Sequence, residues 1–131
     1  MNELAKEILD TVEVGALATV NVDRTPLVTP LHFARLGDSI VWISEPTACH
    51  SENAFRNGKA EFVVWDDKKR AVFLKTNVTE LPESEKEAAM AAYKEKLADF
   101  MPRCQNPQIY VAPIGELDEK TTTGNWLHFI A

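Results

Sequence analysis

The spacing of apolar residues changes sharply after the first dozen positions. Residues 2–12 carry apolar side chains at helical spacing on one face, with Asn2 as a candidate N-cap, and this pattern predicts a helix. From residue 14 to residue 22 the chain is rich in β-branched and small residues and has no helical stripe, which predicts a strand. The chain is therefore predicted to pass from one helix directly into a sheet.

Turn residues divide the next stretch into two more strands. Residues 23–26 and 36–38 have turn chemistry, so strands are predicted over residues 27–35 and 39–44. Short connections predict that the first three strands pair as an antiparallel meander. Because proline cannot donate to a strand ladder, Pro30 is predicted to lie at a sheet edge or a bulge. It either blunts that edge against aggregation or leaves an edge that faces a ligand.

The second half of the chain predicts two helices among further strands. A short helix over residues 48–57 has Thr47 as its candidate N-cap and Gly58 as its stop. A long helix follows over residues 82–100, and Pro102 ends it. Its apolar stripe includes Met90, Tyr93, Leu97 and Met101. The remaining strands are predicted over residues 59–66, 70–80, 108–113 and 125–130, with a charged segment, residues 116–120, between the last two.

The order of these elements predicts the fold class. Short hairpins dominate, and only the long helix is placed to supply a crossover between parallel strands, so the chain is predicted to be mainly β with flanking helices. We expect a small antiparallel barrel, with the short helix after strand 3 and the long helix after strand 5. The 131 residues contain no repeat, linker or low-complexity run, so residues 1–131 are expected to form one domain.

Charge and cysteine content narrow the range of partners and compartments. The net charge of −6 argues against a nucleic acid or an anionic membrane held by bulk electrostatics, so any bound phosphate needs a local device. Cys49 and Cys104 lie outside any CxxC pattern and are expected to be free thiols in a reducing cytoplasm. Neither a signal peptide nor an apolar run of roughly 20 residues is present, which agrees with a cytoplasmic location.

The junction between the third strand and the short helix is the strongest candidate site. A helix N-terminus offers unpaired N–H groups and a partial positive charge. Hydroxyl groups of Ser44, Thr47 and Ser51 and the imidazole of His50 could complete a phosphate site there. The alternative is that Thr47 caps the helix and nothing binds.

Other chemistry has weaker support in the sequence. Cys49 and His50 are adjacent on a helix, where neighbouring side chains point about 100° apart, so they do not form a nucleophile–base pair. His32, His50 and His128 lack the spacing of metal ligands, and no metal site is predicted. Trp42, Trp65 and Trp126 are predicted mostly as core residues, although Trp126 follows a polar run and could cover a flat ligand.

Four segments in succession resemble a known family. They are Gly15 to Val20, Pro26 to Phe33, Gly37 to Ser44 and His50 to Asn57. Together they resemble the pyridoxamine 5′-phosphate oxidase-like family of FMN-binding split barrels, and the match in element order covers nearly the whole chain. The resemblance implies a split β-barrel and a homodimer that binds FMN in clefts between its subunits.

The resemblance also implies site residues. The stretch Val28, Thr29, Pro30, Leu31 and His32 would pass along the flavin ring and ribityl chain, and Ser44 would match a hydroxyl near the cofactor. Cys49 and His50 would match an Arg-Lys pair that grips the phosphate, so two permanent cations are missing here. Arg56, Lys59 and Lys75 are candidates to replace that charge.

The functional prediction follows from the resemblance to this family and from the missing Arg-Lys pair. The first hypothesis is an FMN-dependent oxidoreductase whose substrate and acid–base residues are not identified. Pyridoxamine phosphate oxidation itself is not expected, since the chain shows no match to the C-terminal substrate-binding segment of the biosynthetic oxidases. The alternatives are a non-catalytic ligand-binding or regulatory stress protein with weak or no FMN binding, and a haem-binding protein that uses His32, His50 or His128.

Overall fold

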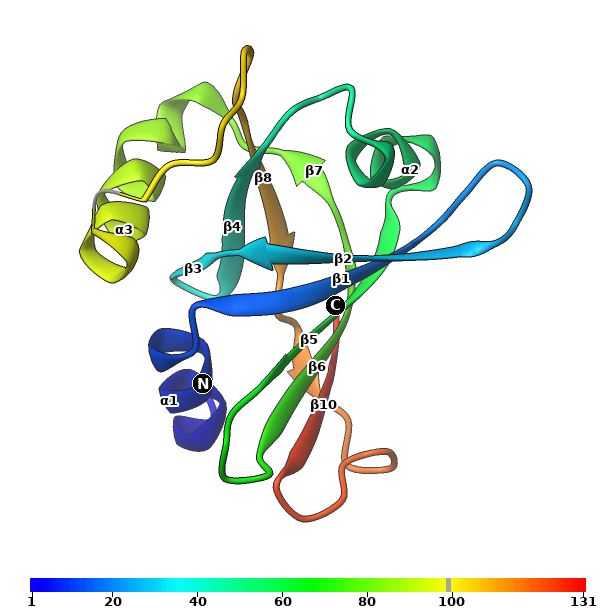
Figure 1. Ribbon diagram of the computed structural model, residues 1–131. Coiled ribbons are helices and arrows are strands. Elements are labelled where there is room, and N and C mark those ends of the chain that lie inside the picture. Colours follow the sequence, from blue (N-terminus) through cyan, green and yellow to red (C-terminus); the bar gives the residue numbers. More distant parts are fainter. Residues whose placement is uncertain (99) are drawn as a thin grey trace.

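The computed structural model describes residues 1–98 and 100–131, which form two β-sheets flanked by helices (Figure 1). The larger sheet contains, in spatial order, β2 (Pro26–His32), β1 (Val14–Val20), β5 (Lys59–Trp65), β6 (Ala71–Asn77), β10 (Trp126–Ile130) and β9 (Glu116–Leu117). The smaller sheet contains β3 (Ala34–Leu36), β4 (Ser39–Ser44), β8 (Gln108–Pro113) and β7 (Thr79–Glu80). The helices are α1 (Glu3–Thr11), α2 (Cys49–Asn57) and α3 (Lys86–Leu97), with a short 3₁₀ turn, η1 (Glu83–Glu85), before α3. The predicted mainly β fold with flanking helices is confirmed.

Two runs that the sequence predicts as single strands pass from one sheet to the other. Residues 27–35 divide into β2 and β3 around Phe33, and residues 70–80 divide into β6 and β7 around Val78. Both switch residues are buried in the core, so the chain bends where their side chains turn inward. These bends allow the two sheets to pack together as a split barrel.

The larger sheet contains one parallel pair that the antiparallel prediction misses. β10 runs parallel to β6, with Trp126 opposite Ala71 and Ile130 opposite Lys75. The connection between them passes through β7, α3, β8 and β9, so it is long enough to reverse the chain. β9 itself falls in the charged segment that was predicted only as a separator. The other strand pairs of both sheets are antiparallel, and β2 is an edge strand, as Pro30 predicts.

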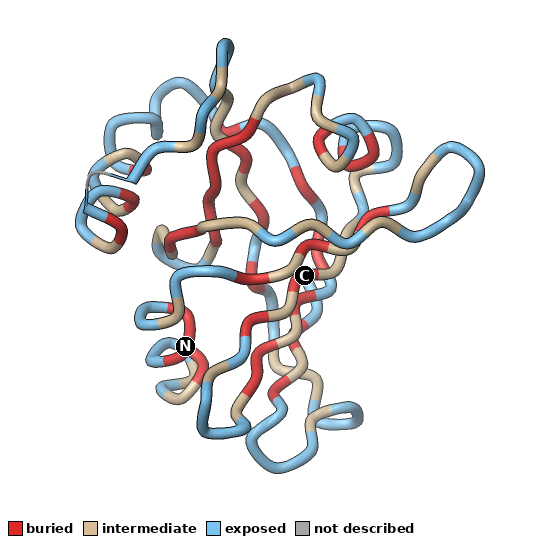
Figure 2. The backbone as a smooth tube through the Cα atoms, viewed as in Figure 1, coloured by how far each residue is buried: buried red, intermediate tan, exposed pale blue. Residues whose placement is uncertain are grey.

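Alternating strand residues fill the space between the sheets, as the red positions in Figure 2 show. Trp42 lies at the centre, with its ring 6.2 Å from Phe62 and 6.1 Å from Tyr110. A second cluster lies under α3, where Tyr93 and Leu97 pack against the smaller sheet. The core placement predicted for Trp42 and the packing stripe of α3 are therefore observed. The described helices contain no segment long and apolar enough to cross a membrane.

The helix ends agree with the sequence at some positions and differ at others. Asn2 caps α1, since its side chain accepts a hydrogen bond from the Ala5 backbone at 3.0 Å. Gly58 ends α2 in the left-handed region, with φ of 75°. Thr47, however, is not the N-cap of α2: the cap position is Ala48, which provides no side-chain hydrogen bond.

The predicted end of the long helix is wrong. α3 ends at Leu97, five residues before Pro102, and Met101 is exposed rather than part of the packed stripe. The following Ala98 has φ of 54° and takes the chain out of the helix. The predicted range also included residue 99, which lies outside the described residues.

The outward face of the larger sheet is exposed and partly apolar. Val28, Trp65 and Trp126 are 64%, 56% and 54% exposed, so the core prediction for Trp65 and Trp126 is wrong. The described helices pack elsewhere: α1 contributes Ile8 and Leu9 to the core between the sheets. Exposed large apolar residues gathered on one face are typical of an interaction surface.

Candidate functional site

The β4–α2 junction brings together two of the predicted site residues. Ser44 is the last residue of β4 and is 7% exposed, because β4 pairs with β8 along its full length. His50 lies in the first turn of α2, and its Nε2 atom is 2.7 Å from Ser44 Oγ. The turn between them therefore folds the imidazole back onto the end of the strand.

Burial determines the charge of His50. The partly buried imidazole loses hydration, and this desolvation lowers the pKa of His50 below its ordinary value of 6.5. The neutral ring can accept a hydrogen bond from the Ser44 hydroxyl at Nε2, or donate one to Ser44 Oγ from Nε2 in its other tautomer. At neutral pH the junction therefore offers hydrogen bonds rather than a permanent positive charge.

The start of α2 adds backbone donors to this junction. No side chain caps the helix, so the first-turn N–H groups lack a side-chain acceptor and can meet an anion. Thr47 and Cys49 are both exposed beside them. Glu52 in the first turn and the nearby Glu45, which accepts hydrogen bonds from the backbone of the segment before β8, oppose an anion by charge.

Two polar side chains fasten α2 to the larger sheet instead of facing a ligand. Asn53 is buried, and its Nδ2 donates to Thr19 Oγ1 at 3.2 Å and to Asn21 Oδ1 at 2.9 Å. Arg56 donates to the Val20 carbonyl at 3.1 Å. Of the three cations proposed to replace the missing pair, Arg56 is thus already engaged in holding the helix.

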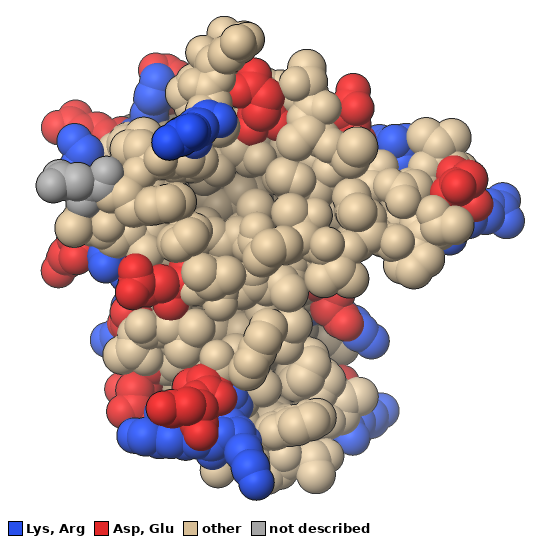
Figure 3. Space-filling view, in the orientation of Figure 1, with Lys and Arg blue, Asp and Glu red and all other residues tan. Residues whose placement is uncertain are grey.

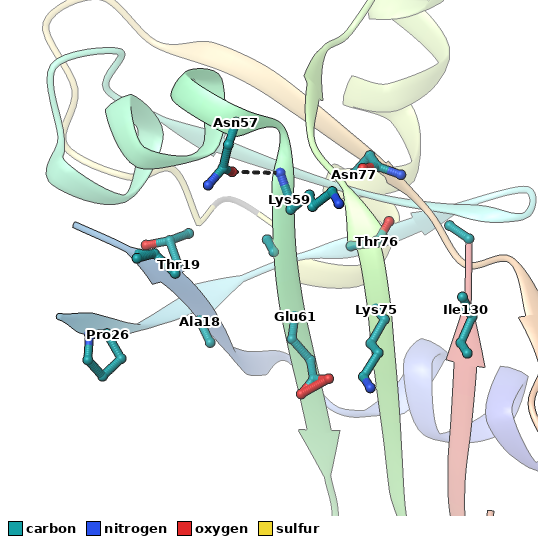
Figure 4. A pocket seen from close by; sticks show the side chains of 13 residues that line it. Ala18, Thr19, Pro26, Asn57, Lys59, Glu61, Lys75, Thr76, Asn77 and Ile130 are labelled. Atoms are coloured by element: carbon teal, nitrogen blue, oxygen red, sulfur yellow. Dashed lines mark hydrogen bonds between the residues drawn. The ribbon is translucent and has the colours of Figure 1, made fainter. Parts of the chain in front are cut away.

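The other two candidate cations, Lys59 and Lys75, share a cavity at the C-terminal end of α2 (Figure 4). The cavity measures about 560 Å³ and opens on the outward face of the larger sheet. Lys59 lies near Asn77 in this view, while Glu61 points beside Lys75, its partner across β5 and β6. The sequence named both lysines as substitutes for the missing charge but gave no sign that paired strands would bring them together.

The β2 stretch does not present all five predicted residues to one ligand. Strand geometry alternates the side chains, so Val28 and Pro30 are exposed on the outward face, while Thr29 and Leu31 point toward the core side. His32, at the end of the strand, stacks on Phe100 with ring centroids 3.9 Å apart. Figure 3 shows a hollow above β2 with a mostly uncharged rim.

Trp126 lies far from the β4–α2 junction. β10 begins at the end of the larger sheet opposite α2 (Figure 1), and the Trp126 Nε1 atom donates to the Lys69 carbonyl at 3.3 Å. The structure therefore separates Trp126 from the other predicted cofactor residues. Among the described residues no cluster of histidine, cysteine and carboxylate side chains could hold a metal ion.

Comparison with known proteins places this architecture in a family. Residues 1–116 match the family described as Pyridoxamine 5′-phosphate oxidase, and the chain belongs to that family. No curated protein sequence matches the chain.

Solved structures share the fold at low sequence identity. A putative 5-nitroimidazole antibiotic resistance protein from Bacteroides thetaiotaomicron is 14% identical, with a TM-score of 0.69 over 86% of this chain and 80% of that one. An FAD-binding protein from Mesorhizobium loti is 20% identical, with a TM-score of 0.69 over 87% of this chain and 88% of that one. A heme binding protein from Mycobacterium smegmatis is 21% identical, with a TM-score of 0.72 over 86% of this chain, which spans 50% of that protein's length.

Proposed function

We propose that the protein is a homodimeric FMN-binding oxidoreductase that holds the cofactor phosphate at the β4–α2 junction. The observation that carries this proposal is the 2.7 Å contact between Ser44 and His50 at a helix start that no side chain caps. In a member of this family, the contact gathers hydroxyl, imidazole and backbone donors at one point.

The donor set fits a phosphate through neutral hydrogen bonds. Ser44 and the first-turn N–H groups of α2 can donate at once, and a dianion beside His50 would favour its protonated form. Charged hydrogen bonds contribute about 1.5–3 kcal/mol each, so loss of an Arg-Lys pair weakens the site. We therefore propose binding that is weaker than in a site with two permanent cations.

The exposed part of β2 is the proposed support for the flavin ring. Val28 and Pro30 offer apolar contacts on the outward face, and the proline leaves the strand edge without one donor. FMN would supply the electron-transfer chemistry when bound. The residues of this chain would bind and orient it and exclude water from one side of the ring.

The same outward face is the proposed contact with a second copy of the chain. Val14, Val20 and Val28 are exposed there, on adjacent strands β1 and β2. Two copies related by a two-fold axis would bury the same apolar patch on each subunit. A cofactor bound at the edge of this patch would then be enclosed by both subunits.

Retention of flavin tests the cofactor site. Purified protein mixed with excess FMN should carry flavin absorbance through gel filtration, and His50→Lys should bind FMN about tenfold more tightly because it restores a cation. Ser44→Ala should weaken binding, while Thr11→Ala, at an exposed residue of α1 outside the junction, should leave it unchanged. If neither wild type nor His50→Lys retains flavin, the proposal is wrong.

A turnover assay distinguishes an FMN-dependent oxidoreductase from a non-catalytic FMN-binding protein. An FMN-loaded oxidoreductase should oxidise a nicotinamide cofactor in the presence of an electron acceptor. A protein that retains FMN and shows no such turnover with either nicotinamide cofactor would instead be a ligand-binding or regulatory member of the family.

Haem binding is a second candidate, because the fold is shared with a heme binding protein and the imidazole of His128 lies on the open sheet face. The His128 ring stacks flat on Phe73, with centroids 4.2 Å apart. Titration with haemin should produce a Soret band that His128→Ala removes. No Soret band in the wild type would dismiss this candidate.

A further inference from the structure

Two exposed tryptophans lie in one row across three strands of the larger sheet. Trp65 on β5 is opposite Ala71 on β6, and Ala71 is in turn opposite Trp126 on β10. Directly opposed residues point to the same face of a sheet, and neighbouring strands lie about 4.8 Å apart. The two indoles therefore rise from backbones about 10 Å apart, with the small Ala71 side chain between them.

The row forms a slot with walls and a floor. Trp65 and Trp126 are 56% and 54% exposed, whereas Ala71 between them is 4% exposed. Phe73 closes the slot on the next row, with its ring 5.9 Å from Trp126. A cavity of about 540 Å³ lies over these residues, within the range of small-molecule sites.

One wall of the slot is held in place before any ligand arrives. The Trp126 indole donates from Nε1 to the Lys69 carbonyl at 3.3 Å and leans on Phe73. Phe73 is itself stacked on His128 with an interplanar angle of 3°. A fixed aromatic wall lowers the entropy lost when a flat ligand binds.

The aromatic lining of the cavity favours a flat ring. Trp65, Phe73 and Trp126 line it together. Aromatic rings prefer offset-stacked or edge-to-face contacts with one another, with centroids about 4.5–7 Å apart. A saturated ring of the same size has no π face and gains only apolar contact.

The rim of the slot supplies a positive charge. Arg70 is held by Asp66 at 2.6 Å and by Glu7 at 2.9 Å, so its charge is already paired. Lys69 lines the same cavity, is exposed, and makes no ion pair with any described residue. An acidic group on the ligand could meet the Lys69 ammonium at the open end.

We propose that Trp65, Ala71, Trp126 and Lys69 form a second binding site, for a planar aromatic carboxylate. It is distinct from the proposed FMN site, because this end of β5, β6 and β10 lies opposite α2 (Figure 1). A concave slot with an alanine floor favours a small flat ligand over a second protein copy, which would need a broad complementary surface.

The test uses 2-naphthoate as the planar acid and cyclohexanecarboxylate as its saturated control. Wild-type protein should bind 2-naphthoate, with quenching of tryptophan fluorescence, and should bind the control at least about tenfold more weakly. Ala71→Leu keeps both tryptophans but fills the slot, so it should weaken 2-naphthoate binding by about tenfold or more. Ala91→Leu places the same side chain at an exposed position of α3 and should bind like wild type.

The contribution of the Lys69 ammonium is tested separately. Lys69→Gln should weaken binding of 2-naphthoate by several-fold and leave binding of neutral 2-naphthol unchanged. Trp65→Ala provides a second variant of the slot if Ala71→Leu does not keep the wild-type melting temperature.

Three results would overturn the proposal. The first is equal affinity of the wild type for the planar and saturated acids. The second is unchanged 2-naphthoate binding in Ala71→Leu and Trp65→Ala. The third is conversion of a dimer to a monomer by Trp65→Ala in sedimentation, with no measurable 2-naphthoate binding by wild type, which would assign the row to a contact between copies.

Discussion

Asn53 joins α2 to the first strand of the larger sheet with one amide nitrogen. Its Nδ2 donates to both Thr19 and Asn21, and the side chain is buried. The residue lies in the segment His50 to Asn57, one of the four segments by which the sequence resembles its family. Here that residue holds the helix against the sheet, so its role is to position the β4–α2 junction.

Asn53→Ala should destabilise the protein by about 2 kcal/mol, because Thr19 and Asn21 lose a buried hydrogen-bond partner. The free energy of unfolding in urea measures this loss. Glu52→Ala, an exposed neighbour on the same helix, is the matched control and should change stability by less than about 0.5 kcal/mol. Equal stability of Asn53→Ala and wild type would contradict the structural role.

Lys96 is a second residue whose environment has a measurable consequence. Its Nζ donates to the Leu9 carbonyl at 2.8 Å and lies 3.5 Å from the centroid of the Phe33 ring. Desolvation by burial lowers the pKa of Lys96 from 10.5 to about 8, although Asp10 and Glu13 favour its charge. The ammonium is thus kept at some cost to the folded state.

The stability of the protein should therefore rise with pH in an alkaline window. Between about pH 8 and 10.5 the unfolded chain holds a proton on Lys96 that the folded chain has released, so the free energy of unfolding increases with pH there. Below about pH 8 Lys96 is protonated in both states, so it no longer makes the free energy of unfolding depend on pH.

Urea unfolding of wild type and Lys96→Met across this window provides the measurement. The stability of wild type relative to Lys96→Met should increase from pH 8 to pH 10.5. Lys94→Met, which removes an exposed lysine from the same helix, should keep the wild-type slope. A wild-type slope in Lys96→Met would assign the effect to another group.

At the scale of single elements, the end of α2 is determined by one residue, Gly58. Gly58 takes φ of 75° at the end of α2, and a Cβ placed there meets no atom within 4 Å. A substitution at Gly58 therefore changes backbone strain without creating a clash. The position isolates the contribution of the left-handed conformation.

Gly58→Ala should reduce stability by about 1 kcal/mol, because alanine adopts the left-handed region at a cost. Gly58→Asn should lose less, since asparagine tolerates this conformation. Thermal denaturation of the two variants ranks them. A larger loss for asparagine than for alanine would show that the backbone conformation does not control this position.

The sequence predicted most strands and the three α-helices that the structure describes, because their signals are local. Alternation and turn residues marked β1, β4, β5 and β8, and Asn2 and Gly58 marked two helix ends correctly. The switches at Phe33 and Val78 were missed, since a buried residue at a bend looks like any other strand residue. The parallel partner of β10 was missed because pairing between distant strands leaves no periodic signal.

The candidate site was predictable only in part, for the same reason. Ser44 and His50 lie six residues apart across one turn, and the predicted junction does bring them together. Lys59 and Lys75 meet only through the pairing of β5 with β6. Trp126 was grouped with the cofactor residues, yet β10 carries it to the opposite end of the sheet.

At the scale of the whole molecule, the open face of the larger sheet is the proposed contact between copies of the chain. Val28→Glu places a charge at the centre of the proposed contact and should convert the dimer to a monomer. Val22→Glu is the control: Val22 is 79% exposed, but it lies in the turn between β1 and β2 rather than on the sheet face.

Analytical ultracentrifugation of the two variants at equal concentration gives the result. Wild type and Val22→Glu should sediment as dimers and Val28→Glu as a monomer. Dimers in all three would place the subunit contact on another surface. A monomeric wild type would remove the dimer from the proposed function.

The parallel pairing of β10 with β6 has a consequence for the folding kinetics. The hairpins of β1 with β2 and of β5 with β6 close over a few residues, whereas Trp126 must reach Ala71 across the intervening smaller sheet and α3. Closing so long a loop costs more chain entropy before its contacts form. We expect β10 to dock after the hairpins, so that backbone amides of β10 gain protection from hydrogen exchange last during refolding.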